Sequence, residues 1–343
     1  MSKSNPLHSG ITRRQLLGSA AALPLFAIGT GKANAAEFTY KLATGQDPKH
    51  PVNVRAQQAI DRIREATGGR LDIRLFPANQ LGSDTDLLTQ VRTGSVEFFN
   101  EASVVLSTLV PAAGIVNTGF AFSDYSQVWK AMDGSLGTYV RAQIEKAGLL
   151  TMSKAWDNGF RNVTTSSKAV HEPGDLKGVK LRVPPAPMLL DLFKAIGSSP
   201  TPINFNELYS ALQTHLVDGE ENPLAIISTA HLYEVQKYCS LTNHVWDAYW
   251  ILGNPAAFAR LPKPIQEIVR REFDRAAGEE RADIQSLSNS LQKTLAAKGL
   301  QMIEPDKPAF KKALVAAGFY RKLRTSFGDQ AWSLLQDNVG ALG

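Results

Sequence analysis

Arg182 is the residue whose type and position best fit a chemical role. It lies in the segment KGVKLRVPP (residues 177–185), where apolar residues at every second position predict a strand that stops at the proline pair. Arg182 then lies near the carboxyl end of that strand, the edge at which open α/β sheets bind ligands. Its planar guanidinium can bind a carboxylate through two parallel hydrogen bonds. By pattern alone, a surface ion pair explains the same arginine more simply.

The sequence lacks the motifs of common catalytic and metal-binding sites. It has no GxSxG, HExxH or CxxC, and no GxGxxG that follows a strand. The histidines show no metal-ligand spacing. Cys239, the single cysteine, is more typical of a small apolar core residue than of a nucleophile. We therefore expect no cofactor, no metal and no catalytic residue, and an enzyme is the weaker hypothesis.

The first 35 residues have the composition of an export signal. They carry four basic and no acidic residues, an apolar run over residues 16–29, and small residues before an expected cut that leaves Ala36 as the new N-terminus. The sequence TRRQLL at residues 12–17 matches a twin-arginine signal. We expect a periplasmic protein, exported by the twin-arginine pathway, that does not span the membrane.

Removal of this leader changes the charge of the chain. The formal net charge falls from +5 to +1, because four basic residues are lost with it. No basic run remains, so neither nucleic acid nor an anionic membrane surface is an expected partner. A single cysteine excludes an intramolecular disulfide. The roughly 308 remaining residues can bury a large core and are expected to form two domains.

Hydrophobic periodicity predicts an α/β fold. Helices are expected at residues 52–66 and 87–91, and strands at residues 38–43, 71–76, 96–99, 149–156, 179–183 and 239–241. The repeated order of strand, helix and strand predicts a largely parallel sheet.

The C-terminal third is predicted to be helical. Residues 264–298 form one run of helix-favouring residues that opens on Pro264. A helix of this length measures roughly 50 Å, too long for one small domain, so we expect it to bridge two lobes. Residues 309–342 predict two more amphipathic helices.

Four blocks of sequence resemble one known family. The blocks are DNGFRNVTT (157–165), DLKGVKLRVP (175–184), SPTPINFNELYSALQ (199–213) and VDGEENPL (217–224). In this order they are similar to the signature of the substrate-binding proteins of TRAP (tripartite ATP-independent periplasmic) transporters, the DctP type. Weaker similarity covers nearly all of the mature chain, including LFPANQLG at residues 75–82.

The resemblance implies a two-lobe periplasmic-binding-protein fold with hinge strands and a long lobe-spanning helix. It implies lobe I over residues 36–158 and 248–287, and lobe II over residues 159–247 and 288–343. The lobes would close on a small organic acid and pass it to the TRAP membrane permease subunits. A monomer is expected.

Site residues follow from the matching positions. The resemblance implies that Arg182 pairs with the ligand carboxylate, that Arg161 is a second donor, that Asn222 offers an amide and that Phe205 offers a packing surface. Glu101 is a further candidate in the first lobe, where the polar residue of the sialic-acid-binding members is not clearly matched. Trp156 is one of several aromatic residues near the implied cleft; the others are Phe98, Phe99, Trp246, Tyr249 and Trp250. Core packing explains these aromatics equally well.

Two other function classes remain open. The chain could present a ligand to a sensor kinase or an ABC permease, or it could be a periplasmic enzyme on a similar fold. The sequence leaves the acid open among an aromatic 2-oxo or 2-hydroxy acid, a dicarboxylate and a sugar acid. The supply of aromatic residues favours a monocarboxylate with an apolar or aromatic body.

Overall fold

The computed structural model describes residues 35–343. Residues 36–343 form one compact unit. The expected export signal occupies residues 1–35, so all but its last residue lies outside the described part. In that part, no helix is both long enough and apolar enough to cross a bilayer.

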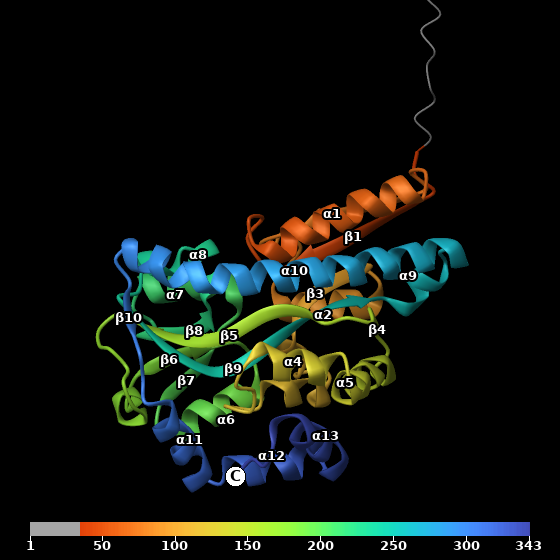
Figure 1. The fold of residues 1–343 in the computed structure, drawn as a ribbon. Helices are drawn as coiled ribbons and strands as arrows, with labels where there is room; N and C mark the ends of the chain where they lie inside the picture. Colours follow the sequence, from red (N-terminus) through yellow and green to blue (C-terminus); the bar gives the residue numbers. More distant parts are fainter. Residues whose placement is uncertain (1–34) are drawn as a thin grey trace, which may run out of the picture. The chain divides into compact units, whose positions relative to one another are not determined.

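One mixed sheet of ten strands runs through the unit (Figure 1). Its main path has the order β2-β1-β3-β9-β5-β8-β6-β7, and β4 and β10 each pair with β9. The strands are β1 (Phe38–Thr44), β2 (Leu71–Phe76), β3 (Phe98–Ala102), β4 (Leu150–Thr151), β5 (Trp156–Thr165), β6 (Lys180–Val183), β7 (Ser199–Pro202), β8 (Gly219–Pro223), β9 (Tyr238–Gly253) and β10 (Gln301–Ile303).

Helices connect and cover these strands. The α-helices are α1 (Pro51–Ala66), α2 (Asp84–Thr93), α3 (Ser103–Leu106), α4 (Tyr125–Met132), α5 (Ser135–Lys146), α6 (Pro187–Ala195), α7 (Phe205–Gln213), α8 (Leu224–Thr229), α9 (Pro255–Ala259), α10 (Lys263–Ala297), α11 (Lys307–Ala316), α12 (Phe319–Phe327) and α13 (Asp329–Val339). Short 3₁₀ helices are η1 (Pro111–Asn117), η2 (Pro173–Leu176) and η3 (Leu232–Glu234).

The sheet consists of two parallel halves joined by antiparallel strands. Strand β1 pairs in parallel with β2 and β3, which we call the first sheet half. Strand β6 pairs in parallel with β7 and β8, the second sheet half. Strand β9 runs antiparallel to β3 and β5, and β5 antiparallel to β8. The expected parallel pairing is therefore confirmed within each half and wrong for the strands that join them.

Strands β5 and β9 reach both sheet halves. The sequence predicted only residues 239–241 of β9, which is 16 residues long, because polar residues such as His244 and Asp247 interrupt its apolar run. All but two of its residues are buried, so these polar groups must find partners inside the protein. The strand expected at residues 149–156 is also different: β4 ends at Thr151 and β5 begins at Trp156.

The pairing of β5 with β9 is irregular at two places. The register shifts between Asp157 and Gly159 and again between Arg161 and Val163. Such bulges leave a residue out of the ladder and turn its side chain toward a new direction. Gly159 has φ +108°, a conformation that side-chain-bearing residues rarely adopt, and an added Cβ would lie 3.3 Å from Pro223.

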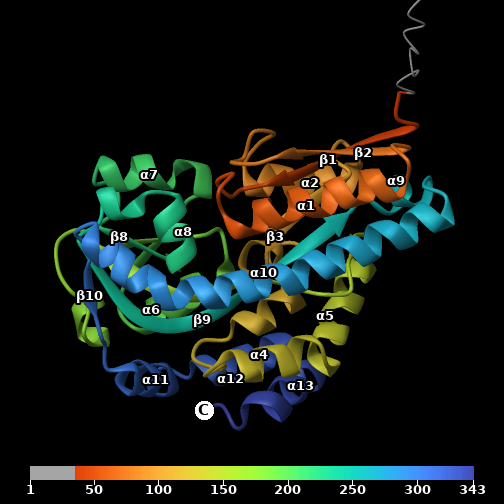
Figure 2. The same ribbon diagram turned by 45° about the horizontal axis from the view of Figure 1, so that its top comes forward.

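Helix α10 spans the sheet, as predicted. Its 35 residues agree with the predicted range to within one residue at each end. In Figures 1 and 2 it runs from the side of α8 and β10 past α1 to α9. Arg55 of α1 binds Asp283 through two hydrogen bonds of 2.6 and 2.8 Å, and Arg62 binds Glu272 at 2.9 Å. The helix also packs against β5 and α8, so it contacts elements of both sheet halves.

The tail holds three helices where two were expected. Glycines at 318 and 328, with φ of +68° and +81°, separate them. Helices α11 and α12 pack against α6, and α13 packs against α4, α5 and η1. The tail therefore contacts parts of both predicted lobes.

Candidate functional site

A narrow cavity lies between the two sheet halves. Its polar lining comes from three sources: Gln46, Asp84, Asn100 and Glu101 in the first sheet half and its loops; Arg182 and Asn222 in the second; and Asn158, Arg161 and Tyr249 on the joining strands β5 and β9. Phe205, Pro184, Ile226 and Val104 are among the apolar residues that complete it.

Arg182 is the cation in this lining whose hydrogen-bonding capacity is least used. It lies near the carboxyl end of β6, as predicted, and is 1% exposed. Its Nε donates to the Ile203 carbonyl at 2.9 Å, whereas Nη1 has no partner. The Phe205 ring centre lies 6.0 Å from its Cζ. Burial lowers the pKa of Arg182 to about 10, which still leaves it charged at neutral pH.

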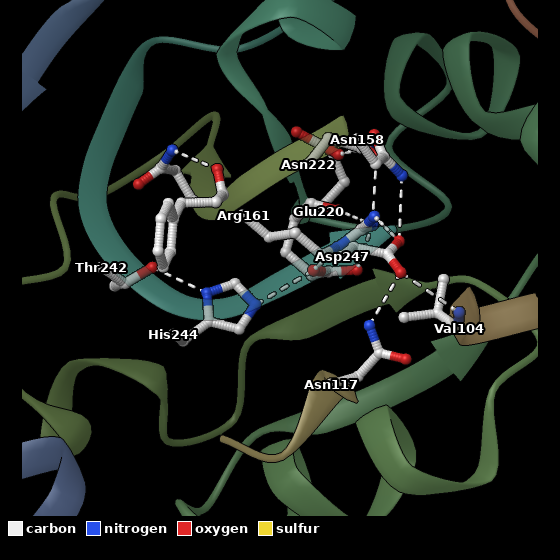
Figure 3. Close-up of polar contacts among 12 residues, drawn as sticks. Val104, Asn117, Asn158, Arg161, Glu220, Asn222, Thr242, His244 and Asp247 are labelled. Atoms are coloured by element: carbon white, nitrogen blue, oxygen red, sulfur yellow. Dashed lines mark hydrogen bonds and ion pairs between the residues drawn. The ribbon is translucent and has the colours of Figure 1, made fainter. Parts of the chain in front are cut away.

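Arg161 is held very differently (Figure 3). Its Nε and Nη2 bind the two carboxylate oxygens of Glu221 at 2.5 and 2.8 Å, and Nη1 lies 3.2 Å from Asp247. Burial lowers its pKa, but the charges of Glu221 and Asp247 outweigh that effect and raise the pKa above its ordinary value. The guanidinium is therefore already matched by two carboxylates of the protein.

A network of neutral side chains fixes those two carboxylates. Asp247 accepts hydrogen bonds from Asn117 at 2.7 Å and from Asn158 at 2.9 Å. His244 Nε2 lies 3.0 Å from Glu221, and its Nδ1 lies 2.8 Å from Thr242 (Figure 3). Burial lowers the pKa of His244, which favours the neutral ring. The carboxylates thus face Arg161 as their main cation.

Asn222 uses both ends of its amide inside the protein. Its Oδ1 accepts from Arg161 Nη2 at 3.1 Å, and its Nδ2 donates to Glu220 at 2.5 Å. Glu220 also accepts from Thr164 at 2.6 Å, and burial raises the pKa of Glu220 to about 7. Asn222 lines the cavity as expected, but its hydrogen bonds orient neighbouring groups.

The opposite wall is acidic. Glu101, on β3, accepts from the Ala102 amide through Oε1 at 2.6 Å, while Oε2 has no partner. Asp84, at the start of α2, accepts from Asn79 at 2.7 Å. Burial raises the pKa of both carboxyl groups, and the charge of Asp84 raises the pKa of Glu101 further.

The structure brings together five of the six residues proposed from the sequence. Arg182, Arg161, Asn222, Phe205 and Glu101 all line the cavity. Trp156 does not; it is fully buried in the sheet, where it pairs with Tyr249 across β5 and β9.

Sequence reasoning missed several residues of the site. They are Gln46, Asp84, Asn100, Asn158, Glu221 and Asp247. Tyr249 was named only as an aromatic residue, and its polar hydroxyl group was missed. One signal was available: polar residues inside otherwise apolar strands, such as Asn100 and Glu101 in FFNEA (98–102), are costly unless they have a role.

A second, larger cavity has a different character. It measures about 280 Å³ and is lined by Tyr125, Gly159, Pro223 and Ile284, among others. Its charged lining residues, Glu304 and Lys307, both reach solvent. Within residues 35–343, no group of His, Cys, Asp and Glu side chains could hold a metal ion. The narrow cavity is therefore the better candidate.

Known proteins resemble this chain over most of its length. Residues 42–320 match the family model described as bacterial extracellular solute-binding protein, family 7 (DctP). The 2,3-diketo-L-gulonate-binding periplasmic protein YiaO of Escherichia coli K12 is 30% identical over 295 residues, which cover 86% of this chain and 88% of YiaO. The uncharacterized protein y4mM of Sinorhizobium fredii is 35% identical over 311 residues, 88% of this chain but 56% of that longer protein.

The fold has solved counterparts. The crystal structure of a TRAP periplasmic solute-binding protein from Polaromonas sp. JS666, bound to D-erythronate, superimposes with a TM-score of 0.84. The two chains are 28% identical, and the match covers 89% of this chain and 99% of the other. The two-lobe fold expected from the sequence is thereby confirmed.

Proposed function

The chain belongs to the bacterial extracellular solute-binding proteins of family 7, and from that premise we propose that Arg182 anchors the carboxylate of a small organic acid between two lobes. The observation that carries this proposal is the unused Nη1 of Arg182, which is buried, charged and part of the cavity wall. A buried charge without a partner is costly. A ligand carboxylate would complete its bonding with the two parallel hydrogen bonds that a guanidinium favours.

The lobes of this proposal have the boundaries expected from the sequence, residues 36–158 with 248–287 and residues 159–247 with 288–343. The cavity draws its two walls from the two sheet halves, and β5 and β9 connect them. A bulge interrupts the ladder of hydrogen bonds and bends its strand locally. We therefore place the hinge at the irregular pairing of β5 with β9, where Gly159 provides backbone freedom.

Delivery of the acid to a TRAP membrane permease, in the periplasm, is the second part of the proposal. Its support is the family and the export signal at residues 1–35. The test of export is intact-mass measurement of protein from the periplasm, with the double variant Arg13→Lys and Arg14→Lys as the control. We expect the wild-type protein in the periplasm with Ala36 as its first residue. The double variant should be absent from the periplasm. A mature protein that keeps residues 1–35 in the membrane would contradict this.

Binding is tested by a thermal-shift screen of organic acids on the mature protein, followed by calorimetry of each hit. A ligand at 100 times its Kd should add roughly 2.7 kcal/mol to the free energy of unfolding. Failure of every acid, with the protein folded, would contradict the proposed function. Uptake by proteoliposomes that contain the permease subunits, with and without the binding protein, tests delivery.

We propose that the protein binds its ligand without changing it. YiaO and the Polaromonas protein are both named as binding proteins. Recovery of an altered acid after incubation with catalytic amounts of protein would instead favour a periplasmic enzyme. A neighbouring sensor kinase or ABC permease gene would favour the role of a ligand-presenting protein.

A further inference from the structure

Seven buried polar atoms of the cavity wall have no hydrogen-bond partner. They are Gln46 Oε1, Asn100 Oδ1 and Nδ2, Glu101 Oε2, Asn158 Oδ1, Arg182 Nη1 and Tyr249 OH. All six side chains are at least nine-tenths buried. Buried polar atoms are almost always hydrogen-bonded, because each one without a partner loses its bonds to water and gains nothing in return. Their convergence on one cavity indicates that a polar ligand supplies the missing partners.

The charges of the wall allow for one carboxylate and no more. Among residues 35–343, the cations that line the cavity are Arg161 and Arg182, and Arg161 is already matched by Glu221 and Asp247. The wall opposite Arg182 presents Glu101 and Asp84. A second ligand carboxylate would meet no free cation there and would lie against acidic groups. A dicarboxylate of similar length is therefore expected to bind poorly.

The other unpartnered atoms are mostly acceptors. Gln46, Asn100 and Asn158 each present an amide oxygen, whereas the donors are Arg182 Nη1 and Asn100 Nδ2, and the Glu101 carboxyl and the Tyr249 hydroxyl can do either. The ligand must therefore donate several hydrogen bonds. These oxygens belong to different elements, the loop after β1, β3 and β5. Hydroxyl groups spread along a chain can reach all of them, whereas one ammonium group reaches only acceptors gathered around a single nitrogen.

The aromatic residues give no support to an aromatic ligand body. Of the six aromatic residues counted from the sequence, five are buried in the core away from the cavity: Phe98, Phe99, Trp156, Trp246 and Trp250. Of the six, only Tyr249 lines it, and it presents a hydroxyl group there. Phe205, also in the wall, lies beside Arg182, with its ring centre 6.0 Å from the guanidinium carbon. The expectation of an apolar or aromatic ligand body is therefore replaced.

We propose that the ligand is a monocarboxylate whose body carries several hydroxyl groups, a sugar acid of the aldonate type, with the carboxylate on Arg182 and the hydroxyls on Gln46, Asn100, Glu101 and Asn158. This inference rests on the proposed function, since it names the class of acid that the same site takes. Glu101 is the specificity-determining residue of the proposal: it accepts from a hydroxyl group and excludes a second carboxylate.

The test is calorimetry with a set of six-carbon probes, to which the four-carbon aldonate D-erythronate and one aromatic acid are added. The aldonates are D-gluconate, D-galactonate, L-gulonate and D-erythronate. Relative to gluconate, D-glucarate adds a second carboxylate and glucitol lacks the carboxylate. Adipate is the dicarboxylate without the hydroxyl groups of glucarate. 6-aminohexanoate carries an ammonium group, and phenylpyruvate is the aromatic acid. We expect at least one aldonate to bind, and glucarate to bind about 100-fold more weakly than the best aldonate. The other probes should bind no better than glucarate.

Glu101→Gln tests the role of the acidic wall. The amide keeps an acceptor but cannot ionise, so a second ligand carboxylate no longer lies against an acidic group there, and the preference for aldonate over glucarate should shrink about 10-fold. Glu207→Gln makes the same change on the exposed side of α7, outside the cavity, and should leave the preference unchanged. Thermal unfolding of both variants shows that they are folded before the ratio is read.

The outcomes separate this inference from the proposed function. A dicarboxylate, an aromatic acid or 6-aminohexanoate that binds better than every aldonate would overturn the inference and leave the binding of an organic acid intact. An unchanged preference in a folded Glu101→Gln protein would overturn the role of Glu101. Binding of no acid at all would overturn both proposals.

Discussion

The backbone amide of Asp157 donates to the Glu280 side chain at 2.8 Å, so the backbone of β5 is tied to a buried carboxyl group of α10. Asp157 also accepts from the Trp246 indole at 2.9 Å. Asp157 Oδ2 and Glu280 Oε1 have no partner. Burial is the main reason that the pKa of both carboxyl groups is raised, so the protonation of this pair depends on pH.

The stability of the protein should depend on the protonation of Asp157. Burial is the main reason that its pKa rises from 3.8 to about 7. Between these values the native state binds more protons than the unfolded state, so stability falls as pH rises through the window. Asp157→Asn removes this effect. Urea unfolding should show that the free energy of unfolding of the variant, relative to wild type, increases from about pH 5 to about pH 8.

Asp124→Asn is the control for that experiment. A hydrogen bond from the Gln127 amide lowers the pKa of Asp124, so this group is ionised in both states across the same range. The difference between this variant and wild type should not change with pH. If the difference in the free energy of unfolding between Asp157→Asn and wild type is also independent of pH, Asp157 does not titrate in this pH range.

Arg182→Ala should abolish most of the affinity for the acid. The variant leaves the ligand carboxylate buried without its counter-charge, which costs on the order of 2–5 kcal/mol, or roughly 30-fold to several thousand-fold in Kd. Arg182→Lys should not restore it, because a point charge lacks the two-bond geometry. Calorimetry measures both, and Arg260→Ala, an exposed arginine outside the cavity, serves as the control. If the Kd of Arg182→Ala stays close to that of wild type, another residue anchors the carboxylate.

Arg161→Ala should act on folding more than on the ligand. It leaves Glu221 and Asp247 buried without their cation, a loss of roughly 3–5 kcal/mol in the free energy of unfolding. Urea denaturation tests this. Glu221→Ala should lower the free energy of unfolding less in the Arg161→Ala protein than in wild type, because the ion pair with Arg161 is already lost there. Arg70→Ala, which breaks a surface pair with Glu37, should change stability little. A similarly small effect for Arg161→Ala would contradict the inference.

Ligand binding should bring the lobes together. The cavity has walls on both sheet halves, and an anion is desolvated only when both walls reach it. Small-angle scattering should therefore give a smaller radius of gyration with ligand, and no change for Arg182→Ala at the same ligand concentration. Identical curves for wild type, at concentrations where calorimetry shows saturation, would rule out this closure.

Local patterns in the sequence were enough to place many elements. Alternation of apolar residues located β2 and β6, and the long run of helix-favouring residues located α10, because both depend on neighbours in the chain. They also put Arg182 at a strand end. The full length of β9 was hidden, because its polar residues are stabilised by partners far away in the sequence.

The sequence by itself determined the family, the α/β fold and the two arginines that line the cavity. Only the tertiary structure decided which arginine is free: Arg161 meets Glu221 and Asp247, residues 60 and 86 positions away, and Arg182 meets no carboxylate within bonding distance. The unpartnered polar atoms of the cavity wall could not be found from the sequence either, since the loop after β1 and strands β3, β5, β6 and β9 bring them together. A residue's type sets what it can bind, but distances between remote side chains set what it has already bound.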